Sequence, residues 1–155
     1  MEALFAWLQS TAVATAVGDS ILLTGALSAV HLLGFTLVTG GALVANMRLL
    51  GLLLPERPVL DVVRPTSRGI AVGLTISVAT GVLLFAPRAL VASGNRIFQI
   101  KMLLLASAAA FHFIVVRAVS RRPLVGRGVT RTVGGAGFLL WVGLALAGCA
   151  FILLE

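Results

Sequence analysis

The stretch SILLTGALSAVHLLGFTLVTGGALVA, from Ser20 to Ala45, decides the fold class, because its single ionisable residue is His31. A helix needs about 20 mainly apolar residues to cross the roughly 30 Å hydrocarbon core of a bilayer, since each residue advances it by about 1.5 Å. Backbone hydrogen bonds inside lipid must be satisfied within the segment. A run of this length and composition therefore predicts a transmembrane helix.

Three more stretches of this kind follow along the chain. The predicted spans cover about 20–46, 69–87, 97–118 and 132–154. Composition agrees, because 59% of the 155 residues are hydrophobic and 11% are charged, whereas soluble chains are about half apolar and about a quarter charged. We therefore predict an all-α fold, an integral membrane four-helix bundle in which 1–155 form a single membrane domain.

Residues 1–18 differ from the spans in their pattern. Apolar residues around Trp7 alternate loosely with polar ones, which predicts a short interfacial helix lying on the membrane surface. No Lys or Arg precedes the apolar part, so we expect a retained segment and not a cleaved signal peptide. Ser20 then caps the first span after the break at Gly18 and Asp19.

Basic residues set the predicted orientation, because Lys and Arg gather on the cytoplasmic side of membrane proteins. Most of the 12 follow the first and third spans: Arg48, Arg57, Arg64, Arg68, Arg117, Arg121, Arg122, Arg127 and Arg131. We expect a multi-pass protein of the bacterial inner membrane with both termini outside. The net charge of +7 is then a topology signal, and the partner is the lipid bilayer and not nucleic acid. Pro55, Pro58 and Pro65 predict a turn-rich first connection, about 51–67.

Small residues recur along the spans. In the second span Gly69, Gly73, Ser77 and Gly81 recur every four residues. Helices in lipid associate through close contact of small residues, because burial among lipid tails gives no hydrophobic driving force. Tight bundle packing therefore accounts for most of the glycines. A flat cofactor held between helices would need the same small residues.

The two histidines, one on each of two spans, are the candidate functional residues. An ionisable residue inside a span indicates function, although a lone imidazole can also be satisfied by a hydrogen bond to a neighbouring helix. Ser28 and Gly34 stand one turn from His31, and Ala108 stands one turn before His112, so both faces leave room for a flat group. Two imidazoles can supply the axial ligands of a b-type haem.

The depth of the two histidines agrees with one shared site. His31 lies 12 residues after Asp19 and His112 lies 11 after Lys101, which places both about 16 to 18 Å from the outer edge. The depths from the inner edge differ, because Arg117 follows His112 by only five residues. Lys101 shares a face with His112, where it either meets a haem propionate or marks the end of the helix.

Other chemistry has less support. The spans contain no Asp or Glu, and Cys149 is the single cysteine, so no catalytic residue is predicted and enzymatic activity stays open. Copper is the alternative metal, since imidazole, thioether and thiolate ligands suit Cu(I). Met102 is ten residues from His112, too far along a helix for one site, so haem is the preferred cofactor.

Four short motifs run over most of the chain: HLLGF at 31–35, RLLG at 48–51, TGVLLF at 80–85 and NRIFQIK at 95–101. With them the sequence resembles a family of small four-helix bacterial inner-membrane proteins that carries no assigned activity. The resemblance implies histidines in spans one and three. The chain departs from the pattern at Asn46, where an acidic residue often stands, and at Ala110, where a polar residue is common. A looser similarity to b-type membrane cytochromes and copper-resistance membrane proteins implies haem or copper.

Three hypotheses for function follow. The first is a b-type cytochrome-like electron-transfer protein that binds one haem b between spans one and three through His31 and His112, with a quinone or a redox protein as partner. The second is a non-catalytic structural subunit of a larger membrane complex, redox or photosynthetic, or a homo-oligomer, that docks through its glycine faces. The third is a copper or small-solute permease.

Overall fold

The computed structural model describes residues 2–122 and 125–153, and every secondary-structure element in these two ranges is helical. The elements are α1 (Glu2–Gln9), α2 (Ala12–Asp19), α3 (Ile21–Leu50), α4 (Val59–Phe85), the 3₁₀ turn η1 (Ala86–Arg88), α5 (Ala89–Gly94), α6 (Arg96–Ala110), the π-helical η2 (Phe111–Val116), α7 (Arg117–Ser120) and α8 (Arg127–Leu153). Residue 154 of the predicted fourth span lies outside the described ranges.

Four helical segments are long and apolar enough to cross a membrane: Ile21–Leu50, Val59–Gly94, Arg96–Ser120 and Arg127–Ala150. The prediction of an all-α fold with four such helices after a short N-terminal helix is therefore confirmed. The chain before Ser20 forms two helices, α1 and α2, where one was predicted. As predicted, Ser20 caps α3, because its hydroxyl accepts the Leu23 N–H at 3.2 Å.

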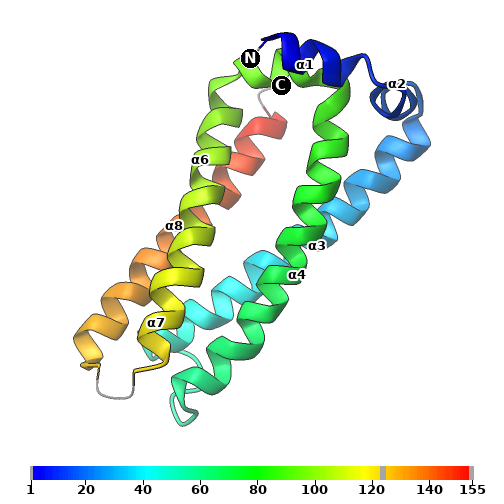
Figure 1. The fold of residues 1–155 in the computed structure, drawn as a ribbon. Helices are drawn as coiled ribbons and strands as arrows, with labels where there is room; N and C mark the ends of the chain where they lie inside the picture. The colour runs from blue at the N-terminus through cyan, green and yellow to red at the C-terminus, as the bar shows by residue number, and fades with distance from the viewer. Residues whose placement is uncertain (1, 123–124, 154–155) are drawn as a thin grey trace.

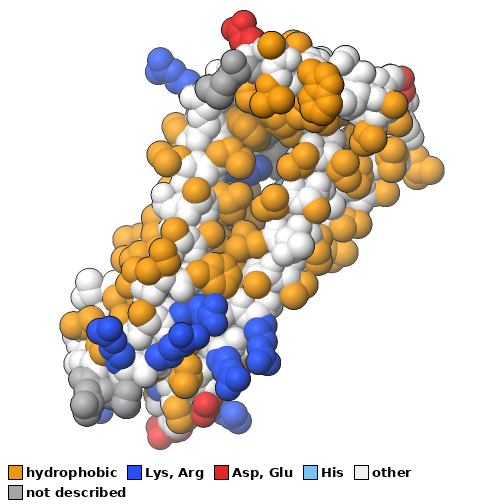
Figure 2. Space-filling model, viewed as in Figure 1, with side chains coloured by type: hydrophobic (Ala, Val, Ile, Leu, Met, Phe, Trp, Pro, Cys, Tyr) orange, Lys and Arg blue, Asp and Glu red, His pale blue; other side chains and the backbone are white. Residues whose placement is uncertain are grey.

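The long helices form an elongated bundle, and the ribbons of α4 and α6 lie apart over the middle of their length (Figure 1). α3 packs along α4 and α8, and α6 packs along α8. α4 contacts the third span at η2 and α7, and near the opposite end the rings of Phe85 on α4 and Phe98 on α6 stack with their centres 5.1 Å apart. We call the end of the bundle at η2 and α7 the basic end, because Lys and Arg gather there (Figure 2). The helices α1, α2 and α5 cover the opposite end (Figure 1). Figure 2 also shows the surface hollowed between α6 and α4 toward that opposite end.

Small residues let α3 and α4 approach closely. A Cβ added at Gly34 would lie 2.7 Å from Ser77 Oγ, and one at Gly73 would lie 2.6 Å from the Gly34 carbonyl oxygen. Neither distance is possible for a real side chain, so both positions require glycine at this separation. The bundle-packing interpretation of the glycines is confirmed here, although Gly69 of the same stripe has nothing within 4 Å.

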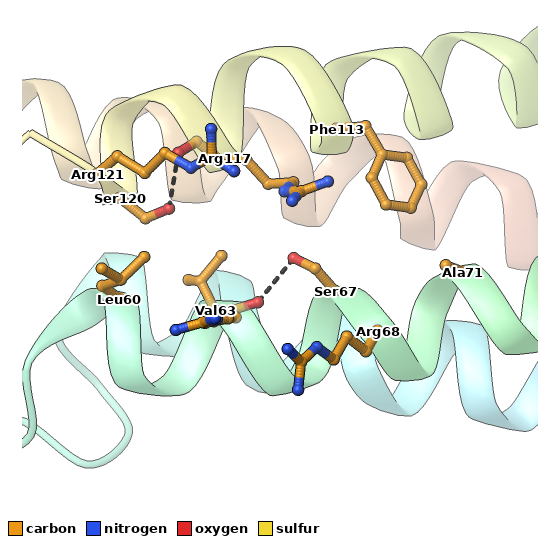
Figure 3. A pocket seen from close by; sticks show the side chains of 10 residues that line it. Leu60, Val63, Ser67, Arg68, Ala71, Phe113, Arg117, Ser120 and Arg121 are labelled. Atoms are coloured by element: carbon orange, nitrogen blue, oxygen red, sulfur yellow. Dashed lines mark hydrogen bonds between the residues drawn. The ribbon is translucent and has the colours of Figure 1, made fainter.

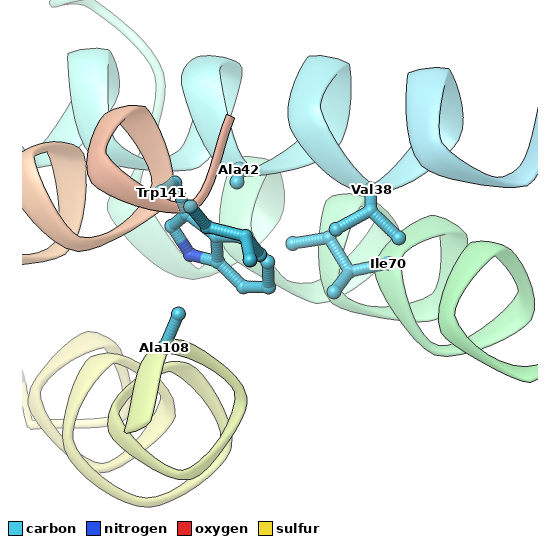
Figure 4. Packing of buried hydrophobic residues seen from close by; sticks show 6 residues of the cluster. Val38, Ala42, Ile70, Ala108 and Trp141 are labelled. Carbon is cyan, nitrogen blue, oxygen red and sulfur yellow. The ribbon is translucent and has the colours of Figure 1, made fainter. Parts of the chain in front are cut away.

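The core consists of two apolar clusters stacked along the bundle. The central cluster, drawn in Figure 4, contains Val38, Ala42, Ile70, Ala108, Trp141 and Leu144, so each of the four long segments contributes to it. The basic-end cluster contains Ala45, Leu49, Val63 and Val116. A membrane bundle held by such contacts depends on shape complementarity, because lipid is as apolar as the core itself.

The predicted connection at 51–67 is shorter in the structure, because α4 already begins at Val59. Pro65 lies inside this helix, where it removes one backbone donor and crowds the carbonyl one turn back. The flanking Val63 and Ile70 are buried in the core, and this packing keeps the segment helical. Arg48 ties the remaining loop to α3, because its guanidinium donates to the carbonyl oxygens of Pro55 at 3.2 Å and Arg57 at 2.9 Å.

Candidate functional site

The third span changes its helical form at its histidine. α6 passes into the π-helical η2, and α7 resumes the α form at Arg117. π segments inside α-helices are rare and occur frequently at functional sites. His112 is the second residue of this segment and is fully buried, at 0% exposure. The backbone and the residue type therefore indicate the same functional position.

The hydrogen bonds around His112 indicate which of its ring nitrogens carries the proton. Its Nε2 lies 2.9 Å from Ser67 Oγ on α4, and Ser67 Oγ donates its proton to the Val63 carbonyl oxygen at 2.6 Å. Because that hydroxyl has no second proton, the neutral imidazole must donate from Nε2 to Ser67. Nδ1 is then a lone-pair acceptor, and among the described residues it has no hydrogen-bond partner.

His112 belongs to a buried polar layer between the two apolar clusters. The layer consists of one residue from each long segment: Asn46, Ser67, His112 and Gly137. Asn46 Nδ2 donates to the Ala42 carbonyl oxygen at 2.8 Å, while its Oδ1 has no hydrogen-bond partner in the described part of the chain. A Cβ at Gly137 would overlap this Oδ1, so the amide lies against the glycine backbone. The layer therefore holds two unpaired acceptors, Asn46 Oδ1 and His112 Nδ1.

A basic cleft of about 390 Å³ opens next to this layer, between α4 and the segment η2–α7 (Figure 3). We call it the arginine cleft, and its polar lining residues are Arg64, Arg68, Arg117, Arg121, Ser67 and Ser120. The described residues that line it include no Asp or Glu. The Arg117 guanidinium carbon lies 5.9 Å from the centre of the Phe113 ring, which steadies it at the wall of the cleft. Ser67 lines the cleft and also contacts His112, so it joins the two.

His31 also meets a hydroxyl of α4, but through its other ring nitrogen, Nδ1. Its Nδ1 lies 3.0 Å from Thr80 Oγ1 on α4, and that hydroxyl donates to the Ile76 carbonyl oxygen at 2.7 Å. The neutral imidazole must therefore donate from Nδ1, which leaves Nε2 with the lone pair. The ring is half-buried, Gly81 lies against its edge, and Lys101 lies within electrostatic range.

The structure does not bring the two histidines together. Their partners on α4, Thr80 and Ser67, are 13 residues apart, which is about 20 Å along a helix. One iron cannot take both imidazoles at this separation, so the predicted pairing does not fit. The depth of His112 was counted from Lys101, but α6 begins at Arg96, five residues earlier.

The other predicted site residues lie in ordinary packing positions. The space beside Gly34 is filled by α4, and Ala108, at 0% exposure, packs in the central cluster with Trp141. Ser28 is half-buried on α3. Lys101 acts electrostatically on His31, although the sequence places it on the face of His112. The room that these small residues leave is therefore used by neighbouring helices at Gly34 and Ala108.

Sequence reasoning missed Ser67 and the cleft as parts of a site, and it marked Asn46 only as a departure from the family pattern. A signal for the cleft was present, because Arg64 and Arg68 are four residues apart, as are Arg117 and Arg121. Residues at this spacing share one helix face. For Ser67 no comparable signal exists, because a serine inside a span is commonly satisfied by its own helix, as Ser67 also is.

Comparison with known proteins defines the family of the chain. Residues 5–153 match a family described as a family of unknown function (DUF6644). The chain belongs to this family. No curated protein and no solved structure matches it. Membership in DUF6644 thus brings no activity with it, and the looser similarity to cytochromes and copper-resistance proteins is not shown. In the described ranges no group of three or more His, Cys, Asp or Glu residues could hold a metal ion.

Proposed function

We propose that the protein is a membrane-embedded binding protein for an anionic ligand, of the small-solute permease class, and that the arginine cleft is its binding site. The observation that carries the proposal is the lining of this cleft by four arginines from two helices with no carboxylate among the described lining residues. Like charges four residues apart on a helix destabilise it. An anion between the helices would compensate all four charges at once.

The chemistry of the lining defines the ligand class. Guanidinium groups bind phosphate, sulfate and carboxylate through paired hydrogen bonds. Ser67 and Ser120 add hydroxyl groups at the same wall. The positive-inside rule places the basic end in the cytoplasm, and it accounts for basic residues at this end of the bundle. It does not account for the presence of four of them along the lining of one cleft with two serines.

The test measures binding of sulfate to the purified protein in lipid nanodiscs by calorimetry. Charged hydrogen bonds contribute about 1.5 to 3 kcal/mol each, so the pair Arg68→Gln and Arg117→Gln should weaken binding at least about tenfold. The control pair Arg127→Gln and Arg131→Gln removes the same charge from exposed residues of the same end, outside the described lining, and should change it less than about twofold. Equal losses in both pairs would mean diffuse surface attraction and would overturn the proposal.

The source of the anionic group is decided in the same experiment. Nanodiscs of phosphatidylcholine alone leave the cleft open to sulfate. Nanodiscs that contain phosphatidylglycerol offer a phosphate headgroup at the membrane surface. If the anionic lipid abolishes sulfate binding to the unaltered protein, the natural ligand is a lipid headgroup. If sulfate binds equally in both, the ligand is a free solute.

Haem b, copper and a role as a complex subunit stay predictions. The separation of the histidines makes the haem prediction easier to test. A haem shared by both imidazoles would lose its Soret band in either His31→Ala or His112→Ala. A haem held by one of them would lose the band in only one variant. Haem-supplemented protein without a Soret band would remove the prediction altogether.

A further inference from the structure

One ring nitrogen of His112, Nδ1, is buried without a hydrogen-bond partner among the described residues. The side chain is fully buried, its Nε2 is engaged by Ser67, and its Nδ1 lone pair has no partner among the described residues. Buried acceptors without partners are unfavourable and uncommon in native structures. Asn46 Oδ1 in the same layer is a second one. A proton on Nδ1 would convert one of these two acceptors into a donor.

The surroundings of His112 oppose that proton while the cleft is empty. The cleft that Ser67 lines also holds Arg64, Arg68, Arg117 and Arg121, and of these Arg117 lies within electrostatic range of the ring. On the side of α8 its neighbour is the uncharged Trp141, whose ring centre is 6.5 Å from that of His112. Lys101 stands three turns away along the same span. An imidazolium here would add a further positive charge to a group of like charges.

An anion in the cleft reverses this balance. It places negative charge beside Ser67, which lines the cleft and accepts the Nε2 proton of His112. We propose that the cleft binds its anion together with one proton, which His112 takes up at Nδ1. This inference rests on the proposed function. Because coupling between two ligands is reciprocal, anion affinity must then rise as pH falls.

The test is sulfate binding measured between about pH 8 and about pH 5, the range in which an imidazole titrates. Sulfate keeps its charge throughout, so a pH dependence belongs to the protein. The affinity should rise as pH falls, by up to about tenfold per pH unit where one proton enters with each anion. His112→Gln keeps an amide donor for Ser67 and should remove this dependence. His31→Gln, which removes the other imidazole, should retain it.

The outcomes separate this inference from the proposed function. If sulfate does not bind at any pH, the anion-binding function itself is wrong. Binding that does not change with pH, or a pH dependence that persists in His112→Gln, would leave that function intact and overturn the coupling. If His112→Gln does not fold, nitrogen NMR of the unaltered protein decides instead. Added sulfate should then protonate Nδ1 of His112 and leave His31 unchanged.

Discussion

The two histidines show how differently one residue type can be placed in the same bundle. Each is bound to a hydroxyl of α4, and each hydroxyl donates to a carbonyl oxygen of its own helix, so each imidazole is the donor. His31 donates from Nδ1 and is half-buried near the divergence of α4 and α6. His112 donates from Nε2 and is fully buried where the π segment meets α4.

The difference shows that the neighbouring helix, and not the local sequence, decides how a histidine in a span is buried and hydrogen-bonded. Both have small residues one turn away, so their sequence surroundings look alike. α4 closes against the third span at η2 and α7, which encloses His112 beside the arginine cleft. The same helices lie farther apart near His31. The four predictions below test this contrast.

The largest expected difference concerns the loss of each imidazole. His112→Ala removes a fully buried side chain from a packed layer, and should lower the free energy of unfolding by about 3 kcal/mol. His31→Ala removes a half-buried ring and should lower it by about 1 kcal/mol. Unfolding of the purified variants in mixed detergent micelles measures both. Equal losses would show that the two environments are energetically the same.

Backbone space beside each histidine site should matter next. Gly137→Ala would overlap Asn46 in the polar layer and should be destabilising by about 2 kcal/mol. Gly81→Ala would bring a Cβ to 3.2 Å from Cε1 of His31, a ring with room to move, and should be destabilising by about 0.5 kcal/mol. Gly148→Ala serves as the control, because nothing lies within 4 Å of it. The same unfolding measurement applies, and a Gly148→Ala loss as large as that of Gly137→Ala would contradict the packing argument.

Removal of the two hydroxyl partners should give a smaller difference in the free energy of unfolding. Ser67→Ala leaves the buried Nε2 proton of His112 without an acceptor and should lower the free energy of unfolding by about 1.5 kcal/mol. Thr80→Val keeps the shape of the side chain and removes the acceptor of the half-buried His31. It should lower the free energy of unfolding by about 0.5 kcal/mol. A larger loss for Thr80→Val than for Ser67→Ala would reverse the proposed order of burial.

The last prediction involves no change in stability. At neutral pH the two imidazoles should be opposite tautomers, with the lone pair on Nε2 of His31 and on Nδ1 of His112. Nitrogen NMR of histidine-labelled protein distinguishes the two forms. Ser67→Ala should perturb the signals of His112 alone and thereby assign them. Identical tautomers would mean that at least one of the two hydroxyls donates to its histidine.

Much of the fold could be predicted, because the length of an apolar run sets a transmembrane helix without any tertiary information. The start of α4 could not, since Pro65 argued for a turn and only the burial of Val63 and Ile70 explains why the helix continues. The glycine contacts between Gly34 and Gly73 were anticipated from their spacing as bundle packing. Their exact partners depend on the register of α3 against α4.

The candidate site was predicted by residue type and not by arrangement. Both histidines were singled out, but whether they meet depends on helix offsets of several residues, which no sequence count from Lys101 could supply. The π segment has no composition that distinguishes FHFIVV from an α-helical run. The cleft depends on the approach of α4 and α7, and only the spacing of its arginines was visible beforehand.

The π segment also determines where the chain could lose one residue without a change of helix register. A helix closed by wider i→i+5 turns contains a surplus residue compared with an α-helix that follows the same path. Deletion of one codon within 111–116 could restore a regular α-helix and leave both flanking halves of the span in register. Deletion of one codon in α6 would instead rotate everything before it by about 100°. The bundle would thus keep its register after a one-residue deletion within 111–116, whereas the placement of His112 would change.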